Sequence, residues 1–344
     1  MKFINLKKEL IFISTLSILT LSCERIDEPK KEENPYSFTV PDYIGKPVYN
    51  FENNPFSNKG YELGRLLFYD PILSSDSSVS CANCHNQAHA FADHHVALST
   101  GVNNKIGTRN SPPIFNLAWH PHFMWDGGIN HLEIMPLAPI TNHLEMNETM
   151  GNVIKKLNKN STYKTLFKNA FFVDSINDQK LFYALTQFIG KIQSFGSKYD
   201  KVKQGKEQFT PDENKGYALF KTHCNSCHTE PLFSSFEFVN NGIDSIFKDK
   251  GRYLITLNHS DEGLFKIPSL RNVALTYPYM HDGRFRTLNE VMNHYSENIK
   301  KSKTLDHRIS QPLKLKQDEI QNIVLFLNTL TDYEFTNNKL YSEP

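Results

Sequence analysis

One pentapeptide pattern occurs twice in the chain, and its residues are the ones best suited to do chemistry. Each copy reads Cys-x-x-Cys-His, where two thiols can attach a haem covalently and the histidine becomes an axial iron ligand. Zinc is the alternative for paired Cys-x-x-Cys motifs, but zinc does not explain the histidine directly after each second cysteine. The sequence therefore predicts two covalently bound haem c groups, attached at Cys81, Cys84 and His85 and at Cys224, Cys227 and His228.

Composition narrows the class of protein. The chain has 344 residues, enough for two domains, and its formal net charge of +1 gives no basic signature, so we expect no nucleic-acid partner. Four of the five cysteines belong to the haem motifs, and the fifth is Cys23. No cysteine is left over for a structural disulfide.

The N-terminus has the layout of an export signal. Lysines precede an apolar run from Leu10 to Ser22 that is too short to span a bilayer comfortably. Cys23 follows the run directly, which predicts a lipoprotein-type signal peptide over residues 1–23 and a lipid anchor at Cys23; an ordinary signal peptide with an incidental cysteine is the alternative. Either form places the protein in the periplasm or outer cell envelope, and the charged residues 24–36 read as a flexible tether.

Helical patterns dominate the remainder. Apolar residues from Leu181 to Ile192 follow a helical period with Asn177 as a candidate N-cap, in the clearer of two helices expected between residues 150 and 195. A charged stretch over 196–208 breaks the pattern, and Thr210-Pro211-Asp212-Glu213 restarts it with a capping box. We therefore predict a mostly α fold with long loops and two haem domains, over residues 37–205 and 206–344, ending in a helix at about 317–330.

An internal repeat extends beyond the haem motifs. After each motif comes an Arg-Asn pair, at residues 109–110 and 271–272, and then an aromatic-Met-x-Asp-Gly string, at residues 123–127 and 279–283. Three ordered elements make duplication a better explanation than chance. The variable position in the second string is Trp125 in one half and His281 in the other, so we expect the two haems to have different tasks.

Several longer strings resemble one known family. LGRLLFYDPILS, SCANCH, TRNSPPIFN, MWDG, PLAPITNHLEM, GYALFKTHCNSCH, FKIPSLRNVALTYPYMHDGRF and FLNTLTD are similar to segments of the bacterial diheme cytochrome c peroxidases, a family that includes MauG. The resemblance covers roughly residues 55–335. It implies two cytochrome-c-like helical domains, in which peroxide reacts at the N-terminal haem and the C-terminal haem receives electrons and passes them across.

The same resemblance assigns roles to individual residues. The active-site glutamate falls on Glu145, a candidate general acid–base, and the tryptophan between the haems falls on Trp125, for which core packing is the alternative. The family's calcium ligands fall on Asn110, Thr276 and Pro278, the last two through backbone carbonyls, which suit this hard cation.

Four positions depart from the commonest family pattern. Val102 stands where many relatives have a distal histidine, which predicts an open first haem, and Met135 and Gly128 replace a glutamine and an arginine. Tyr295, as in MauG, falls on the position of the second haem's sixth ligand, where many relatives have methionine. Met280, Met292 and simple packing of Tyr295 against haem are the alternatives.

The leading functional prediction is a peroxidase that reduces hydrogen peroxide to water with electrons from a small donor such as a cytochrome c. A MauG-like oxidase that modifies a partner protein and a diheme electron-transfer protein without peroxide chemistry are the alternatives. Val102 and Tyr295 favour the MauG branch, whereas Glu145 and an open haem argue against mere electron transfer. The chain could also pair with a second copy as a homodimer.

Overall fold

The computed structural model describes residues 38–93 and 95–344. The predicted signal peptide, Cys23 and the tether lie outside the described residues. Among the helices of the described part, none is long and apolar enough to cross a membrane. We call residues 38–205 the first half of the chain and residues 206–344 the second half.

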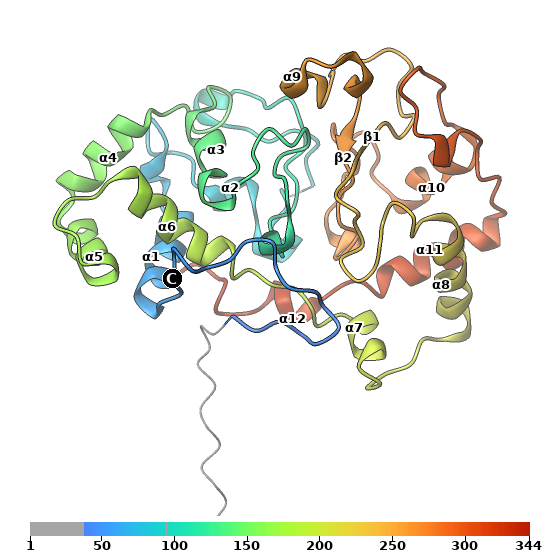
Figure 1. The fold of residues 1–344 in the computed structure, drawn as a ribbon, viewed down its shortest axis with the longest axis horizontal. Helices are drawn as coiled ribbons and strands as arrows, with labels where there is room; N and C mark the ends of the chain where they lie inside the picture. Colours follow the sequence, from blue (N-terminus) through green and yellow to red (C-terminus); the bar gives the residue numbers. More distant parts are fainter. Residues whose placement is uncertain (1–37, 94) are drawn as a thin grey trace, which may run out of the picture. The chain divides into compact units, whose positions relative to one another are not determined.

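The described chain is mostly helical, which confirms the predicted fold class (Figure 1). The helices of the first half are α1 (Asn58–Tyr69), α2 (Cys81–Cys84), α3 (Leu137–Thr141), α4 (Met150–Lys159), α5 (Ser161–Phe171), α6 (Asp178–Ile189) and α7 (Lys198–Lys203). Those of the second half are α8 (Pro211–His223), α9 (Tyr253–Thr256), α10 (Leu288–Glu297), α11 (Gln317–Asn328) and α12 (Tyr333–Thr336). Two short strands, β1 (Phe238–Val239) and β2 (Phe265–Lys266), pair antiparallel. Single turns of 3₁₀-helix punctuate the loops at Pro71–Leu73, Gln87–His89, Val102–Asn104, Leu117–Trp119, Leu132–Ile134, His259–Asp261, Val273–Leu275 and His307–Ile309.

Local capping signals set several of these boundaries. The Asn177 side chain accepts from the Lys180 N–H at the start of α6, as predicted. Thr210 and Glu213 form the predicted capping box of α8, with Pro211 at the first helical position. The region 150–195 holds three helices rather than the two predicted, because Asn160 ends α4 and its side chain caps α5 at once. The last long helix ends at Asn328, close to the predicted 330.

Each half is built on one close helix pair. α1 packs against α6 and α8 packs against α11 (Figure 1). In each pair a glycine makes the contact: a Cβ at Gly64 would overlap the Ala184 carbonyl oxygen, and one at Gly216 would overlap the Asn322 carbonyl oxygen. The next contact repeats too, with Phe188 and Phe326 each 3.0 Å from the added Cβ. The duplication therefore includes the close packing of the helix before each haem motif against the backbone of its partner helix.

The structure corrects the way the repeats align. Asn116, rather than Asn110, is the counterpart of Asn272. Both have left-handed backbone, with φ of 55° and 57°, and each precedes one turn of 3₁₀-helix. Each lies eight residues before the methionine of the aromatic-Met-x-Asp-Gly string, so the spacing is constant. The expected Arg-Asn match was wrong because it joined two chemically similar dipeptides at different structural positions.

The C-terminal segment returns to the first half. Phe335 and Tyr341 belong to the apolar cluster that includes Tyr61 and Phe188. The Tyr61 hydroxyl donates to the Leu340 carbonyl at 2.5 Å. The tail therefore ties the end of the chain to the helix pair beneath the first haem motif.

A buried ion pair fixes the segment between the halves. The Arg271 guanidinium binds both carboxylate oxygens of Asp200 at 2.9 Å, and the two side chains are 1% and 0% exposed. Burial alone would raise the Asp200 pKa, but the Arg271 charge and hydrogen bonds hold it below its ordinary value. Such a pair is costly to break, because the remaining charge would be buried without a partner.

Candidate active site

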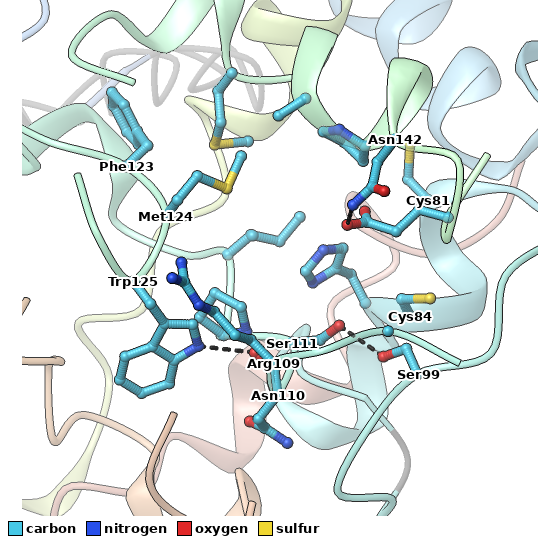
Figure 2. Close-up of a pocket in the computed structure, with 18 of the residues that line it drawn as sticks. Cys81, Cys84, Ser99, Arg109, Asn110, Ser111, Phe123, Met124, Trp125 and Asn142 are labelled. Atoms are coloured by element: carbon cyan, nitrogen blue, oxygen red, sulfur yellow. Dashed lines mark hydrogen bonds between the residues drawn. The ribbon is translucent and has the colours of Figure 1, made fainter. Parts of the chain in front are cut away.

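A large cavity surrounds the first pentapeptide. It has a volume of about 810 Å³, and Cys81, Cys84 and His85 all line it. Helix α2 consists of the residues from Cys81 to Cys84, so one helical turn presents both thiols beside the histidine. Figure 2 shows Trp125 on the side of the cavity opposite Cys81 and Cys84.

The geometry of His85 suits an axial ligand. Its Nδ1 lies 2.9 Å from the Phe91 carbonyl oxygen, so Nδ1 carries the proton and Nε2 keeps its lone pair for iron. Burial lowers the pKa of the imidazole, which keeps the ring neutral and able to coordinate. The thiols, the neutral imidazole and the cavity thus fit the predicted haem, which these three residues would hold.

Glu145 lines the same cavity. The Asn142 amide donates to its Oε1 at 2.6 Å, the bond drawn as a dashed line from Asn142 in Figure 2. Burial raises the pKa of Glu145, and the Asn142 hydrogen bond offsets part of that rise. A carboxyl group with a raised pKa, one oxygen held and the other available, is suited to exchange a proton with a bound substrate.

Val102 is buried against the loop that holds Glu145. Val102 is 1% exposed, and its N–H donates to the Glu145 carbonyl at 2.8 Å. A Cβ at neighbouring Gly101 would lie 2.5 Å from the same carbonyl oxygen, so only glycine allows this approach. Met135 also lines the cavity, and its thioether cannot donate a hydrogen bond. Glu145 is therefore the acid–base group that the structure brings to this part of the cavity wall.

Trp125 lies where the two halves meet. Its indole N–H donates to the Asn110 carbonyl at 2.8 Å (Figure 2), and the Asn110 N–H donates to the His281 carbonyl at 2.7 Å. The Trp125 carbonyl in turn accepts from the Lys266 N–H at 2.7 Å. The indole thus reaches the first-half cavity while hydrogen bonds connect it to the second half.

The second pentapeptide follows α8 and repeats the orientation of the histidine. His228 Nδ1 lies 3.1 Å from the Pro268 carbonyl and 3.3 Å from the Phe233 carbonyl. Burial lowers the His228 pKa to about 4, so this ring is also neutral. Cys224 and Cys227 flank it in sequence, and the three residues have the donor set of a second covalent haem.

Tyr295 is buried in the second half. Burial raises its pKa to about 12, a hydrogen bond with Asn241 opposes the rise, and electrostatic interaction with Cys227 and Cys224 adds to it. Met280 contacts the same amide, whose Nδ2 lies 3.3 Å from the methionine sulfur. Met292, the other alternative, is buried in the apolar cluster of the second half.

The residues expected to bind calcium come from both halves. The Asn110 amide nitrogen donates to the Ala97 carbonyl at 3.0 Å, which turns its oxygen the other way. No hydrogen bond within the described ranges reaches Asn110 Oδ1 or the carbonyl oxygens of Thr276 and Pro278. Three such oxygens suit a hard cation.

Other residues of the site were missed from the sequence. Lys266 and His120 line the cavity, as does Arg109, which pairs with Asp126 and with Asp249. Lys266 and Asp249 belong to the second half, so only the fold brings them to the first pentapeptide. One signal could have placed Lys266: it precedes Asn272 by as many residues as Asn110 precedes Asn116, which makes Lys266 the counterpart of Asn110.

Comparison with known proteins agrees with this geometry. The model of the di-haem cytochrome c peroxidase family matches residues 58–208, and the cytochrome c model matches residues 213–331. Cytochrome c551 peroxidase of Nitrosomonas europaea is 33% identical over 276 residues, covering 78% of this chain and 79% of that protein. MauG of Methylorubrum extorquens is 33% identical over 282 residues, covering 80% of this chain and 79% of that protein.

A solved structure is similar along nearly its whole length. A MauG-like protein associated with microbial copper homeostasis superposes with a TM-score of 0.82 at 30% identity, covering 90% of this chain and 99% of that one. Together with two haem-binding segments in one chain, these matches establish the cofactor class as haem c. The chain therefore belongs to the di-haem cytochrome c peroxidase family, which includes both the peroxidases and MauG.

Proposed function

We propose that this protein is an exported peroxidase that reduces hydrogen peroxide to water with electrons from a small donor such as a cytochrome c. One observation supports this most directly: Glu145, with its raised pKa, lines the same cavity as Cys81, Cys84 and His85. The relatives named cytochrome c peroxidase have this reaction in their names. Export rests on the N-terminal signal, with Cys23 as the lipid-anchored residue.

The haem, when bound, supplies the electrons and an iron site for peroxide. The protein supplies the proton transfers. Asn142 holds Oε1 of Glu145, which leaves Oε2 to take a proton from one peroxide oxygen and deliver it to the other. Two electrons and two protons then convert one hydrogen peroxide into two waters. Because residue 102 is a valine, no histidine from this position can block the iron, so peroxide needs no prior reduction of the protein to enter.

In this proposal the haem attached at the second pentapeptide receives the electrons from the donor. Trp125 lines the first cavity and is joined to the second half through Asn110 and Lys266, so its indole is placed to relay electrons. A calcium ion held by Asn110, Thr276 and Pro278 would fix the same interface, because those oxygens come from both halves.

A second candidate is a MauG-like oxidase that modifies an aromatic side chain of a partner protein. Tyr295 favours it, because a tyrosine ligand at the second haem would stabilise ferric rather than ferrous iron. The MauG relative of Methylorubrum extorquens is as similar in identity as the peroxidase of Nitrosomonas europaea.

Peroxide kinetics separate the two. The holoprotein is mixed with hydrogen peroxide and a reduced cytochrome c, and peroxide loss and cytochrome oxidation are followed together. Rapid turnover with two cytochromes oxidised per peroxide supports the peroxidase. Slow turnover with a long-lived oxidised protein supports the oxidase, and no reaction with peroxide contradicts both.

A further inference from the structure

Lys266 is a cation of the second half that lines the cavity of the first. It belongs to β2, and its backbone N–H is fixed by the Trp125 carbonyl at 2.7 Å. Its ammonium nitrogen lies 3.5 Å from His120 Nδ1, and both side chains line the cavity. Burial lowers the Lys266 pKa to about 8, because the charged form loses hydration there.

This ammonium lacks an anionic partner in the protein. Within the described ranges, no carboxylate lies within ion-pair distance of Lys266. The neighbouring His120 cannot supply negative charge, since burial and the Lys266 charge hold its pKa well below the ordinary value and keep it neutral. A partly buried cation without a counter-charge is unfavourable unless a ligand provides one.

The other cations of the cavity wall differ from Lys266. Arg109 is neutralised by Asp126 and Asp249. Lys250 is exposed and pairs with Glu262 at 3.2 Å. Lys248 is exposed, so water hydrates its ammonium. The uncompensated, partly buried charge at this cavity is therefore that of Lys266.

Haem chemistry identifies the missing anion. Each haem carries two propionates, on the half of the ring away from the vinyl-derived thioether links. Lys266 is bonded to Trp125, which lies on the side of the cavity opposite Cys81 and Cys84 (Figure 2). We propose that the Lys266 ammonium, oriented by His120, is the counter-ion of a propionate of the haem attached at Cys81 and Cys84.

The pairing would make the first haem's electronics depend on the second half of the chain. A cation beside a propionate offsets its negative charge and so favours the reduced iron, which raises the reduction potential. Lys266 is thus a positioning and tuning residue rather than a catalytic one. The inference depends on the haem and does not depend on whether the reaction is peroxidase or oxidase chemistry.

The test is a potentiometric titration of the holoprotein with Lys266→Met, which keeps an unbranched side chain one atom shorter and removes its charge. The haem stays attached to the variant through its thioethers. The two haems are expected to differ in axial coordination, so the potential of each can be followed by its own spectrum. We expect the potential of the first haem to fall and that of the second to stay. Lys266→Arg, which keeps the charge, should retain most of the original potential.

Lys250→Met is the matched control, because it removes the same charge from the solvent-exposed rim of the cavity. It should move neither potential appreciably, since water screens the lost charge. Equal shifts in Lys266→Met and Lys250→Met, equal shifts at both haems, or no shift would overturn the proposal. A crystal structure of the unaltered holoprotein tests it without any variant: Lys266 Nζ beyond hydrogen-bond distance of both propionates would equally overturn it.

Discussion

The backbone N–H of Asn110 donates to the carbonyl of His281 at 2.7 Å, and the internal repeat contains a second, equivalent bond. The sequence offset that relates Asn116 to Asn272 also relates Asn110 to Lys266, and Trp125 to His281. The Lys266 N–H donates to the Trp125 carbonyl, also at 2.7 Å. Two equivalent backbone hydrogen bonds therefore join the halves. The repeats differ in the side chains of the bonded residues: the donor is asparagine in one bond and lysine in the other, and the acceptor is histidine in one and tryptophan in the other.

Trp125→Phe should slow electron transfer between the haems while leaving the fold intact. The substitution keeps an aromatic ring and the backbone bond to Lys266, but it removes the indole and its hydrogen bond to Asn110. Stopped-flow absorbance would follow oxidation of the second haem after peroxide is added to reduced protein. Losing one such bond should cost about 1 kcal/mol in the free energy of unfolding.

Trp119→Phe is the matched control. Trp119 is the other tryptophan of the chain, and it does not line the cavity. Its indole N–H donates to the Gly45 carbonyl over a distance of 2.6 Å. It should lose similar stability without any change in electron transfer. Equal rates in the Trp125 and Trp119 variants would show that Trp125 serves packing alone.

Glu145→Gln should lower peroxide turnover by about 100-fold or more, the usual contribution of a positioned acid–base group. The amide keeps the shape of the side chain but cannot take up a proton. Steady-state peroxide consumption is the measurement, with the haem spectrum expected to be unchanged. Glu148→Gln is the control in the same loop, because Glu148 pairs with Lys156 instead of lining the cavity.

The pH profile provides an independent check on Glu145. The group must be ionised to accept the first proton, so kcat/KM should fall as pH drops through its pKa. Burial raises that pKa, and the acidic limb should therefore lie above the range of an ordinary carboxylate. Glu145→Gln should lose this limb; a limb that persists in the variant belongs to another group.

Tyr295→Phe should change the low-spin spectrum of the second haem. The variant removes the buried phenol oxygen but keeps the ring, so a lost ligand can be distinguished from lost packing. Electron paramagnetic resonance of the resting protein is the measurement. Tyr279→Phe is the control, because the Tyr279 hydroxyl donates to the Val273 carbonyl at 3.0 Å. An unaltered signal in Tyr295→Phe would leave Met280 or Met292 as the ligand.

Asp200→Asn should destabilise the protein by about 3–5 kcal/mol, because it leaves the Arg271 charge buried without its partner. The Asp200 pKa is lower in the folded than in the unfolded state, so its contribution to stability is present above the unfolded pKa and is lost as pH falls through the folded one. Denaturant unfolding at several pH values measures this. The loss of stability as pH falls below 3.8, the ordinary pKa of aspartate, should be smaller in the variant, whereas Asp174→Asn, in an exposed pair with Lys168, should behave like the original protein.

The sequence alone determined the covalent chemistry and the local structure. The haem motifs place both thiols and the histidine within five consecutive residues, so no tertiary contact is needed to bring them together. The caps at Asn177 and Thr210 were equally readable, because capping is a contact between residues two or three positions apart. The mostly helical character followed from the same local periodicity, whereas the cytochrome-c-like form of the two domains was implied by the family resemblance.

Only the tertiary structure decided which residues share a cavity across the two halves. Lys266 meets Trp125 and His120, and Asn110 meets His281, through contacts between residues more than a hundred positions apart, for which a single sequence has no local signal. The repeat was visible in the sequence but was aligned on the wrong asparagine. The two Arg-Asn dipeptides are identical, whereas the left-handed backbone that Asn116 shares with Asn272 cannot be seen in a sequence. Chemistry confined to one helical turn is written in the sequence, whereas the charge balance of a cavity depends on which distant loops the packing brings to its wall.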